Sequence, residues 1–184
     1  MSDRLFVAVV PPRSVVDAID DFLEPRRDAG TGFRWTVPEG WHLTCVFLPA
    51  VESARIEPLE EALEEVAGRT GPFAVQLAGA GAFPVADRAK ALWLGVTQGA
   101  EDLSRLARRC RNAAVSCGIG VDGGRFHSHL TLARTRPFAA RRWLTILDAI
   151  PEQAWGVEEF ALVRSRLLPG GAGYETLRRF PLAG

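Results

Sequence analysis

The chain has 184 residues, 47% of them hydrophobic and 24% charged, and its formal net charge is zero. This composition is typical of a soluble globular protein and disfavours a protein that coats nucleic acid through a broad basic surface. No apolar run approaches the ~20 residues of a membrane span, and Pro11-Pro12 closes the N-terminal apolar stretch too early for a signal peptide. The three cysteines lack Cys-x-x-Cys spacing, which indicates reduced thiols and predicts a cytoplasmic protein.

The two halves of the chain differ in charge. Residues 1–92 contain nine basic and fourteen acidic side chains, whereas residues 93–184 contain thirteen and eight. Every basic residue except Lys90 is arginine, which suits bidentate phosphate contacts, although a high-GC genome would explain the same preference. The sequence is therefore compatible with a small anion-binding site within a neutral protein.

The first half is predicted to alternate strands and helices. A strand from Arg4 precedes a helix that starts near Pro12, and the spacing of its apolar residues gives that helix one buried face. A strand from His42 to Leu48, which Pro49 should end, precedes a helix from about Ala54 whose acidic residues form a solvated face. Further strands are predicted over residues 73–78 and 91–96.

The second half repeats this alternation. A helix over residues 100–117 precedes a strand from Phe126 to Arg134, and a helix over 139–149 follows. Two closing strands, 157–168 and 174–180, flank a glycine-rich run from Pro169 that is typical of a hairpin loop. The order therefore favours a duplicated α/β unit with a cleft where the halves meet.

Each half contains one strand with the sequence His-Leu-Thr, at His42 and at His129. Side chains alternate between the two faces of a strand, so the histidine and the threonine share one face while the leucine occupies the other. Two such strands facing one cleft would supply an acid, a base and two hydrogen-bond donors.

With both motifs in place, the sequence resembles the two-histidine (2H) phosphoesterase superfamily. It is most similar to the LigT-like RNA 2′,3′-cyclic phosphodiesterases, also called 2′-5′ RNA ligases, whose two His-x-Thr/Ser-x motifs are matched by residues 42–45 and 129–132. The flanking blocks that match are residues 4–8, 34–48, 83–84, 92–96 and 165–175. Cys45, Pro49 and Ser128 depart from the family pattern.

The resemblance implies an α/β (α+β) fold, with residues 1–184 as a single domain of two intertwined, pseudo-symmetric lobes. Each lobe would have a mainly antiparallel sheet with helices outside, and the active-site cleft would lie between the lobes. The implied partner is RNA or an oligonucleotide with a 2′,3′-cyclic phosphate end. We expect a monomer with no cofactor, no metal and no membrane association.

The resemblance also implies roles for five residues. His42 would be the proton donor to the leaving 3′ oxygen and His129 the proton acceptor from water, which would leave a 2′-phosphate. Histidine has a reference pKa of about 6.5, so one imidazole can donate a proton and another accept one near neutral pH. Thr44 and Thr131 would donate hydrogen bonds to the phosphate. Arg134 would pair with the phosphate if a bulge or turn brought it to the face of His129, because its strand parity differs.

Three more residues are candidates for the site. His127 shares a strand face with His129, but a metal pair would need more ligands and only Asp122 is near in sequence, so we expect His127 at the cleft rim or in a structural role. Trp35 and Phe47 belong either to the core or to a platform for a base or ribose.

Other functions stay open alongside cyclic phosphodiesterase activity. The same site run backwards would join RNA ends through a 2′-5′ bond. A small-molecule phosphodiesterase acting on cyclic nucleotides or 2′-5′ oligonucleotides, and a noncatalytic module that binds RNA ends, are the remaining alternatives.

Overall fold

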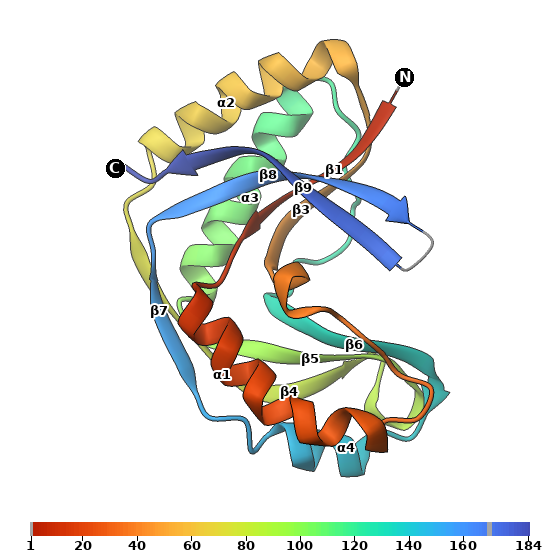
Figure 1. Cartoon of the computed structure of the whole chain (residues 1–184). Coiled ribbons are helices and arrows are strands. Elements are labelled where there is room, and N and C mark those ends of the chain that lie inside the picture. Colours follow the sequence, from red (N-terminus) through yellow and green to blue (C-terminus); the bar gives the residue numbers. More distant parts are fainter. Residues whose placement is uncertain (1, 169–170) are drawn as a thin grey trace.

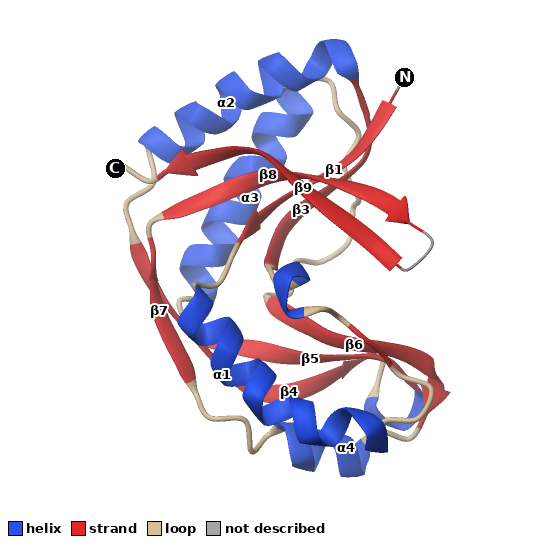
Figure 2. Ribbon diagram, viewed as in Figure 1, coloured by secondary structure: helices blue, strands red, loops and turns tan. Residues whose placement is uncertain are grey.

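The computed structural model describes residues 2–168 and 171–184, which form a curved antiparallel sheet with four α-helices packed against it (Figures 1 and 2). The strand order is β7-β4-β5-β6-β3-β1-β8-β9, and the short β2 pairs with β6. The strands are β1 Ser2–Val9, β2 Arg34–Trp35, β3 Leu43–Glu52, β4 Phe73–Phe83, β5 Ala89–Gln98, β6 His129–Phe138, β7 Gln153–Val157, β8 Glu159–Leu168 and β9 Gly171–Pro181. The helices are α1 Arg13–Leu23, α2 Ile56–Gly68, α3 Ala100–Ser116 and α4 Arg141–Leu147.

The sheet divides into two arms that meet between β3 and β6. One arm contains β1, β3, β8 and β9 and carries α2 and α3, while the other contains β4 to β7 and carries α1 and α4 (Figure 1). Within the described residues, Leu43 and Leu130 form the one Cα pair between β3 and β6, and both side chains are buried. We call this junction the seam. The predicted bilobed fold is thus confirmed, with a continuous sheet running through both lobes.

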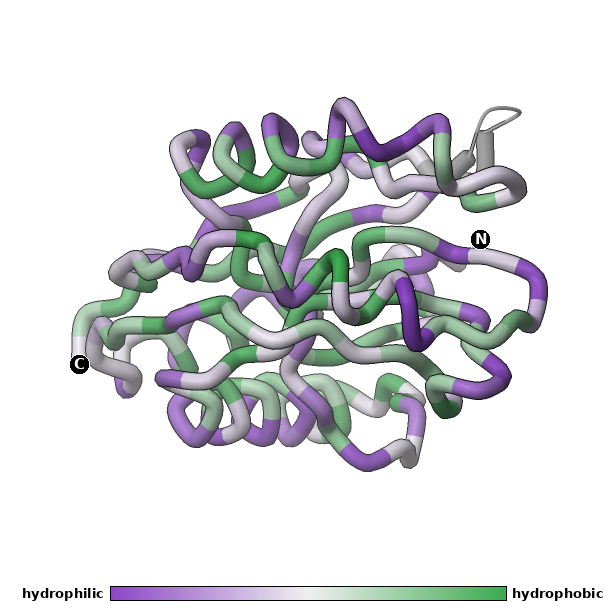
Figure 3. Tube along the Cα trace, turned by 90° about the horizontal axis from the view of Figure 1, so that it is seen from below, coloured by the Kyte–Doolittle hydropathy of each residue, from purple (hydrophilic) through white to green (hydrophobic). Residues whose placement is uncertain are grey.

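The helices pack through apolar stripes that the sequence periodicity predicts. Val15, Ile19 and Leu23 of α1 are buried, as are Leu103 and Leu106 of α3. Burial of each such side chain stabilises the fold by about 1.5–3 kcal/mol. In Figure 3 the hydrophilic side of each helix lies outward and the hydrophobic side faces the sheet. No helix in the described part of the chain is long and apolar enough to cross a membrane.

Pro49 does not end the first histidine strand, contrary to the prediction. β3 continues to Glu52, and its pairing with β1 shifts register between Asp3 and Leu5. The resulting bulge takes up Pro49, which has no N–H to contribute to the ladder. A proline at a bulge is compatible with a continuing strand, so the boundary prediction was wrong.

The second histidine strand begins at His129 rather than at Phe126. His127 therefore precedes β6, so strand parity does not determine its side, although its ring lies 5.9 Å from that of His129. Residue 157 belongs to a separate strand, β7, which the sequence reading missed. The predicted closing hairpin is confirmed by the pairing of β8 with β9, while residues 169–170 of its loop lie outside the described residues.

Candidate active site

The two His-Leu-Thr motifs come together at the seam. The antiparallel pairing of Leu43 with Leu130, extended by one residue each way, sets His42 across from Thr131 and Thr44 across from His129. A cavity of about 400 Å³ opens here and is lined by both histidines and both threonines. We call it the catalytic cavity. The arrangement is close to twofold symmetric, each motif supplying one imidazole and one hydroxyl.

A bulge brings Arg134 to the same cavity. Leu92 of β5 pairs with Ala133, but the next residue, Trp93, pairs with Thr131, so β6 carries one extra residue at this point. Leu132 and Ala133 are consequently both buried, and the alternation resumes with Arg134 facing the cavity. This is the parity change that a phosphate-binding role for Arg134 requires.

The first motif is followed by an equivalent bulge. Val7 of β1 pairs with Val46 and Ala8 pairs with Thr44, which leaves Cys45 as the extra residue. Cys45 and Val46 are both buried, and Phe47 returns to line the catalytic cavity. Phe47 and Arg134 therefore hold equivalent positions, each five residues after its histidine.

His42 is held by a backbone acceptor and two aromatic rings. Its Nδ1 lies 2.7 Å from the carbonyl oxygen of Gly40. The imidazole stacks on Phe6 with ring centroids 4.5 Å apart and meets the edge of Tyr174 at 5.4 Å. Because a carbonyl oxygen only accepts, Nδ1 carries the proton of this bond, and Nε2 is the nitrogen left for proton exchange.

His129 is held in the same way. Its Nδ1 donates to the carbonyl oxygen of His127, also at 2.7 Å and also two residues earlier in the chain. Phe83 meets the ring edge-on at 4.9 Å, and Trp93 lies 6.0 Å away. In the neutral form of each histidine, Nδ1 therefore carries the proton and Nε2 can accept one. The aromatic contacts restrict the orientation of both rings.

The surroundings lower the pKa of both histidines. Burial of the imidazole is the main cause in each, because it disfavours the charged ring. The hydrogen bonds to the carbonyls of Gly40 and His127 oppose this. Nearby charge lowers the pKa further, from His129 and then Arg134 for His42, and from His127 and then Arg134 for His129. In the unliganded protein both histidines are therefore more readily neutral than a free imidazole.

The charge at the catalytic cavity suits an anion. Arg4 and Arg134 line it, and both are exposed and without an ion-pair partner in the described part of the chain. Among the described residues that line the cavity, none is acidic. Hydroxyls of Thr44 and Thr131 add hydrogen-bond donors. The arrangement can bind a phosphate and exchange protons with it from two sides.

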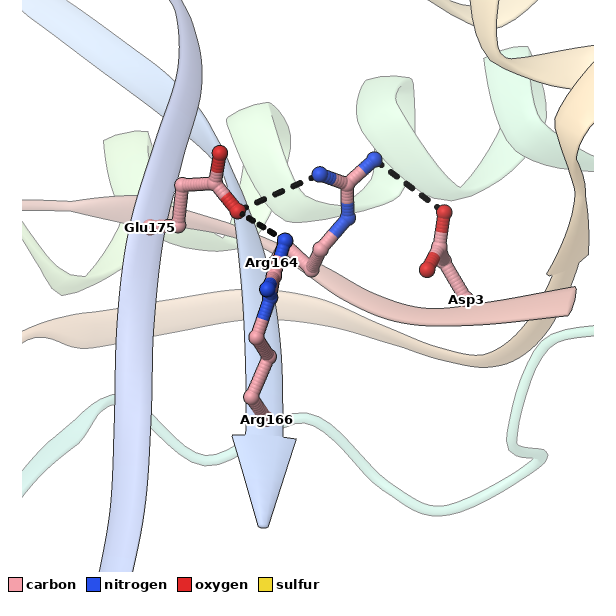
Figure 4. A network of polar contacts seen from close by, with 4 residues as sticks. All are labelled: Asp3, Arg164, Arg166 and Glu175. Atoms are coloured by element: carbon pink, nitrogen blue, oxygen red, sulfur yellow. Dashed lines mark hydrogen bonds and ion pairs between the residues drawn. The ribbon is translucent and has the colours of Figure 1, made fainter. Parts of the chain in front are cut away.

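A network of charged side chains fixes the strands behind the cavity (Figure 4). Arg164 on β8 bonds Asp3 on β1 at 3.1 Å and Glu175 on β9 at 3.2 Å, and Arg166 bonds the same Glu175 oxygen at 2.9 Å. Side chains alternate along these strands, so the neighbours of the network point into the cavity. They include Arg4 and Tyr174. The network therefore ties together the three strands that carry one wall of the cavity.

Two candidate residues lie elsewhere. Trp35 is not among the residues that line the catalytic cavity. Its ring packs against Phe33 and Trp143, and its Nε1 donates to the carbonyl of Arg27 at 3.3 Å. Trp35 therefore takes the core role that the sequence left open.

His127 does not line the catalytic cavity either, but its ring contacts Phe83, Trp93 and the ring of His129. Within the described residues, no group of three His, Cys, Asp or Glu side chains could hold a metal ion. The backbone of His127 orients His129, and its side chain lines a neighbouring cavity.

Sequence reasoning missed several residues that shape the site. Phe6 and Tyr174 enclose His42, although the strand pattern marked Phe6 only as core. Gly40 leaves room for Tyr174, because a Cβ there would lie 3.2 Å from the ring. The one tyrosine of the chain lies in the matching block 165–175, a signal that could have singled it out.

Two His-x-Thr motifs that face one cavity across the seam of a curved antiparallel sheet define a two-histidine phosphoesterase. Comparison with known proteins narrows this class. Residues 15–167 match the model of the 2′-5′ RNA ligase superfamily, and the chain belongs to that family.

The similarity to curated relatives extends over nearly the whole chain. A Geobacillus stearothermophilus protein named RNA 2′,3′-cyclic phosphodiesterase is 31% identical over 97% of this chain but only 57% of its own length. A protein of the same name from Archaeoglobus fulgidus is 31% identical over 96% of this chain and 99% of its own. The crystal structure of Escherichia coli LigT complexed with 3′-AMP is 28% identical, covers both chains fully and gives a TM-score of 0.79.

Proposed function

We propose that this protein is an RNA 2′,3′-cyclic phosphodiesterase that leaves a 2′-phosphate. The observation that carries the proposal is the convergence of His42, His129, Thr44, Thr131 and Arg134 on one cavity that has no acidic side chain among its described lining. The shared name of the relatives supports the reaction, and the complex of LigT with 3′-AMP supports a nucleotide in this site.

The reaction would use the two imidazoles in sequence. Nε2 of His129 takes a proton from water as the water oxygen attacks phosphorus. The bond from phosphorus to the 3′ oxygen breaks, and protonated His42 delivers a proton to that oxygen through Nε2. The products are a 2′-phosphate and a 3′-hydroxyl, and exchange of one proton with solvent at each ring restores the starting state.

The remaining groups would stabilise the phosphate. Negative charge builds up on the nonbridging oxygens as water adds, and the hydroxyls of Thr44 and Thr131 are placed to donate to them. The guanidinium of Arg134 offers two parallel donors and a full positive charge. The exposed ring of Phe47 at the cavity wall offers a stacking surface for the base or ribose.

The function is tested by the product formed without metal. Purified protein with excess chelator should open an oligonucleotide 2′,3′-cyclic phosphate, and phosphorus NMR should show a 2′-phosphomonoester alone. A 3′-phosphate product would reverse the roles assigned to the two ribose oxygens. Activity that appears only on addition of a divalent metal would contradict the acid–base mechanism.

The pH dependence of kcat/KM should reflect the lowered histidine pKa values. The reaction needs His42 protonated and His129 neutral, and kcat/KM reports the ionisation of the free enzyme. Because the pKa of His42 lies below its usual 6.5, the protonated donor is already being lost as pH rises toward that value. With a 2′,3′-cyclic mononucleotide, kcat/KM should therefore be highest below about pH 6.5.

An arginine variant provides the control for this profile. Arg134→Ala removes one cause of the lowered pKa of His42. The fall of kcat/KM at high pH (the alkaline limb) should therefore move to higher pH, whatever happens to the absolute rate. Arg136→Ala removes a nearby charge that does not line the cavity and should leave the limb in place. If kcat/KM of the wild type fell only about one pH unit above 6.5, the assignment of His42 as a buried proton donor would be contradicted.

The family's name also points to 2′-5′ ligation. By microscopic reversibility the same groups would join the ends when a ribose hydroxyl replaces water. Incubation of a strand ending in a 2′,3′-cyclic phosphate with an excess of a strand bearing a 5′-hydroxyl, with analysis for a 2′-5′ bond, measures this direction separately. A cytoplasmic location and a monomeric state stay predictions from the sequence.

A further inference from the structure

A second cavity, of about 390 Å³, adjoins the catalytic cavity. Its outer walls are α3 and the segment of residues 117–128, which runs from the end of α3 to the start of β6 (Figure 1). It shares three lining residues with the catalytic cavity, namely Thr44, Phe47 and His129. The two cavities therefore lie side by side at these side chains.

The second cavity is rich in arginine. Arg108 and Arg111 come from α3, where they lie three residues apart on one helix face, and Arg125 comes from the segment after α3. Asp122 is the one acidic residue among the described residues of this lining, so three guanidinium groups oppose one carboxylate. The local charge is positive even though the whole protein is neutral.

Two of these arginines are free to bind a ligand. Arg111 donates to the backbone carbonyl of Asp122 and so holds the segment against α3. Arg108 and Arg125 are exposed and have no hydrogen bond or ion pair in the part of the chain that the structure describes. Neighbouring arginines on α3 differ, since Arg105 pairs with Asp102 and Arg109 bonds the carbonyl of Arg69.

Phe47 stands between the two cavities. It is an aromatic residue on β3 with 54% of its surface exposed, although its neighbours Val46 and Leu48 are buried. The bulge after Thr44 is what turns it outward. Guanidinium groups beside an exposed aromatic ring are the combination that binds single-stranded nucleic acid, through backbone phosphates and base stacking.

We propose that the second cavity binds the nucleotide that precedes the cyclic-phosphate end of an RNA strand. Arg108 and Arg125 contact the phosphodiester that joins the last two nucleotides, and Phe47 separates the two bases. The inference rests on the proposed function, because it needs the strand end in the catalytic cavity. It predicts that the enzyme prefers RNA strands to cyclic mononucleotides with the same end.

The test compares two substrates and two double variants. The substrates are a mononucleoside 2′,3′-cyclic phosphate and a trinucleotide with the same end. Arg108→Ala/Arg125→Ala should lower the ratio of kcat/KM for the trinucleotide over the mononucleotide at least ~10-fold, as expected for loss of charged hydrogen bonds. Arg88→Ala/Arg142→Ala, which removes the same charge from exposed residues outside both cavities, should leave the ratio unchanged.

An unchanged ratio in Arg108→Ala/Arg125→Ala would overturn the inference while leaving the proposed function intact. An equal fall of the ratio in both double variants would also overturn the inference, because it would reflect the overall charge of the protein. Thermal melting and circular dichroism check that both variants fold.

Binding measurements keep the inference testable if the wild type hydrolyses neither substrate, an outcome that would refute the proposed function. The probe is a fluorescent trinucleotide ending in a 2′-phosphate, titrated at several salt concentrations. Each phosphate contact contributes about 0.7 to the slope of log affinity against log salt for single strands. Arg108→Ala/Arg125→Ala should lower that slope, and the same slope as the wild type would overturn the inference.

Discussion

Replacing His42 or His129 by alanine should lower kcat for a 2′,3′-cyclic mononucleotide by at least ~10²-fold, the usual contribution of one acid or base. The two histidines line the same cavity, each with Nδ1 bonded to a carbonyl and Nε2 left for proton transfer. Because the acid and the base act as a unit in one reaction, and losing either one removes most of the benefit of the other, the double variant should lose little more than the worse single variant. Single-turnover rates of purified variants measure the effect.

The third histidine provides the matched control. His127→Ala removes an imidazole that does not line the catalytic cavity, and its backbone carbonyl still orients His129. The loss of kcat on the mononucleotide should therefore be far smaller than for His42→Ala or His129→Ala. Comparable losses in all three variants would mean that the assignment of the two catalytic histidines is wrong.

Replacing Thr44 or Thr131 by valine should lower kcat by about 10²-fold, at the lower end of the range for loss of one preorganised donor to a developing oxyanion. Valine keeps the β-branched shape and removes only the hydroxyl. Both threonines are half-buried in the cavity wall, where a hydrogen bond to a charged oxygen is less screened than in water. The expected loss should appear in kcat more than in KM, because the charge develops in the transition state.

Serine variants separate the hydroxyl from the packing of the threonines. Thr44→Ser and Thr131→Ser keep the donor and should retain most of the activity. Family motifs that accept either threonine or serine at this place imply the same. If serine and valine variants were equally impaired, the threonine methyl group rather than the hydroxyl would matter, and the phosphate-binding role would fall.

Much of the fold followed from residue patterns. The start of α1 and both ends of α3 lie within a residue of the predicted positions, because the apolar spacing is regular and Gly118 follows α3. Strand ends were harder to predict. The sequence predicts that Pro49 ends its strand, whereas the bulge that accommodates this proline depends on the partner strand β1. Pairing between distant strands leaves no mark in the local sequence.

The residues of the candidate site were easier to predict than their geometry. Repetition of His-Leu-Thr identified the residues that line the catalytic cavity, and parity correctly required a bulge before Arg134. The matching bulge before Phe47 was not foreseen, nor was the packing of Tyr174 against His42. Both depend on contacts between strands that are far apart in sequence.

The equivalence of Phe47 and Arg134 has a consequence for how a substrate is oriented. A site built from two like halves would accept a cyclic phosphate in either of two opposed poses, and each histidine would then serve as acid in one pose and base in the other. An aromatic ring at one position and a cation at the other make the poses unequal. In the proposed reaction, the choice of which ribose oxygen leaves would then depend on the pair of residues that follow the two bulges as well as on the histidines.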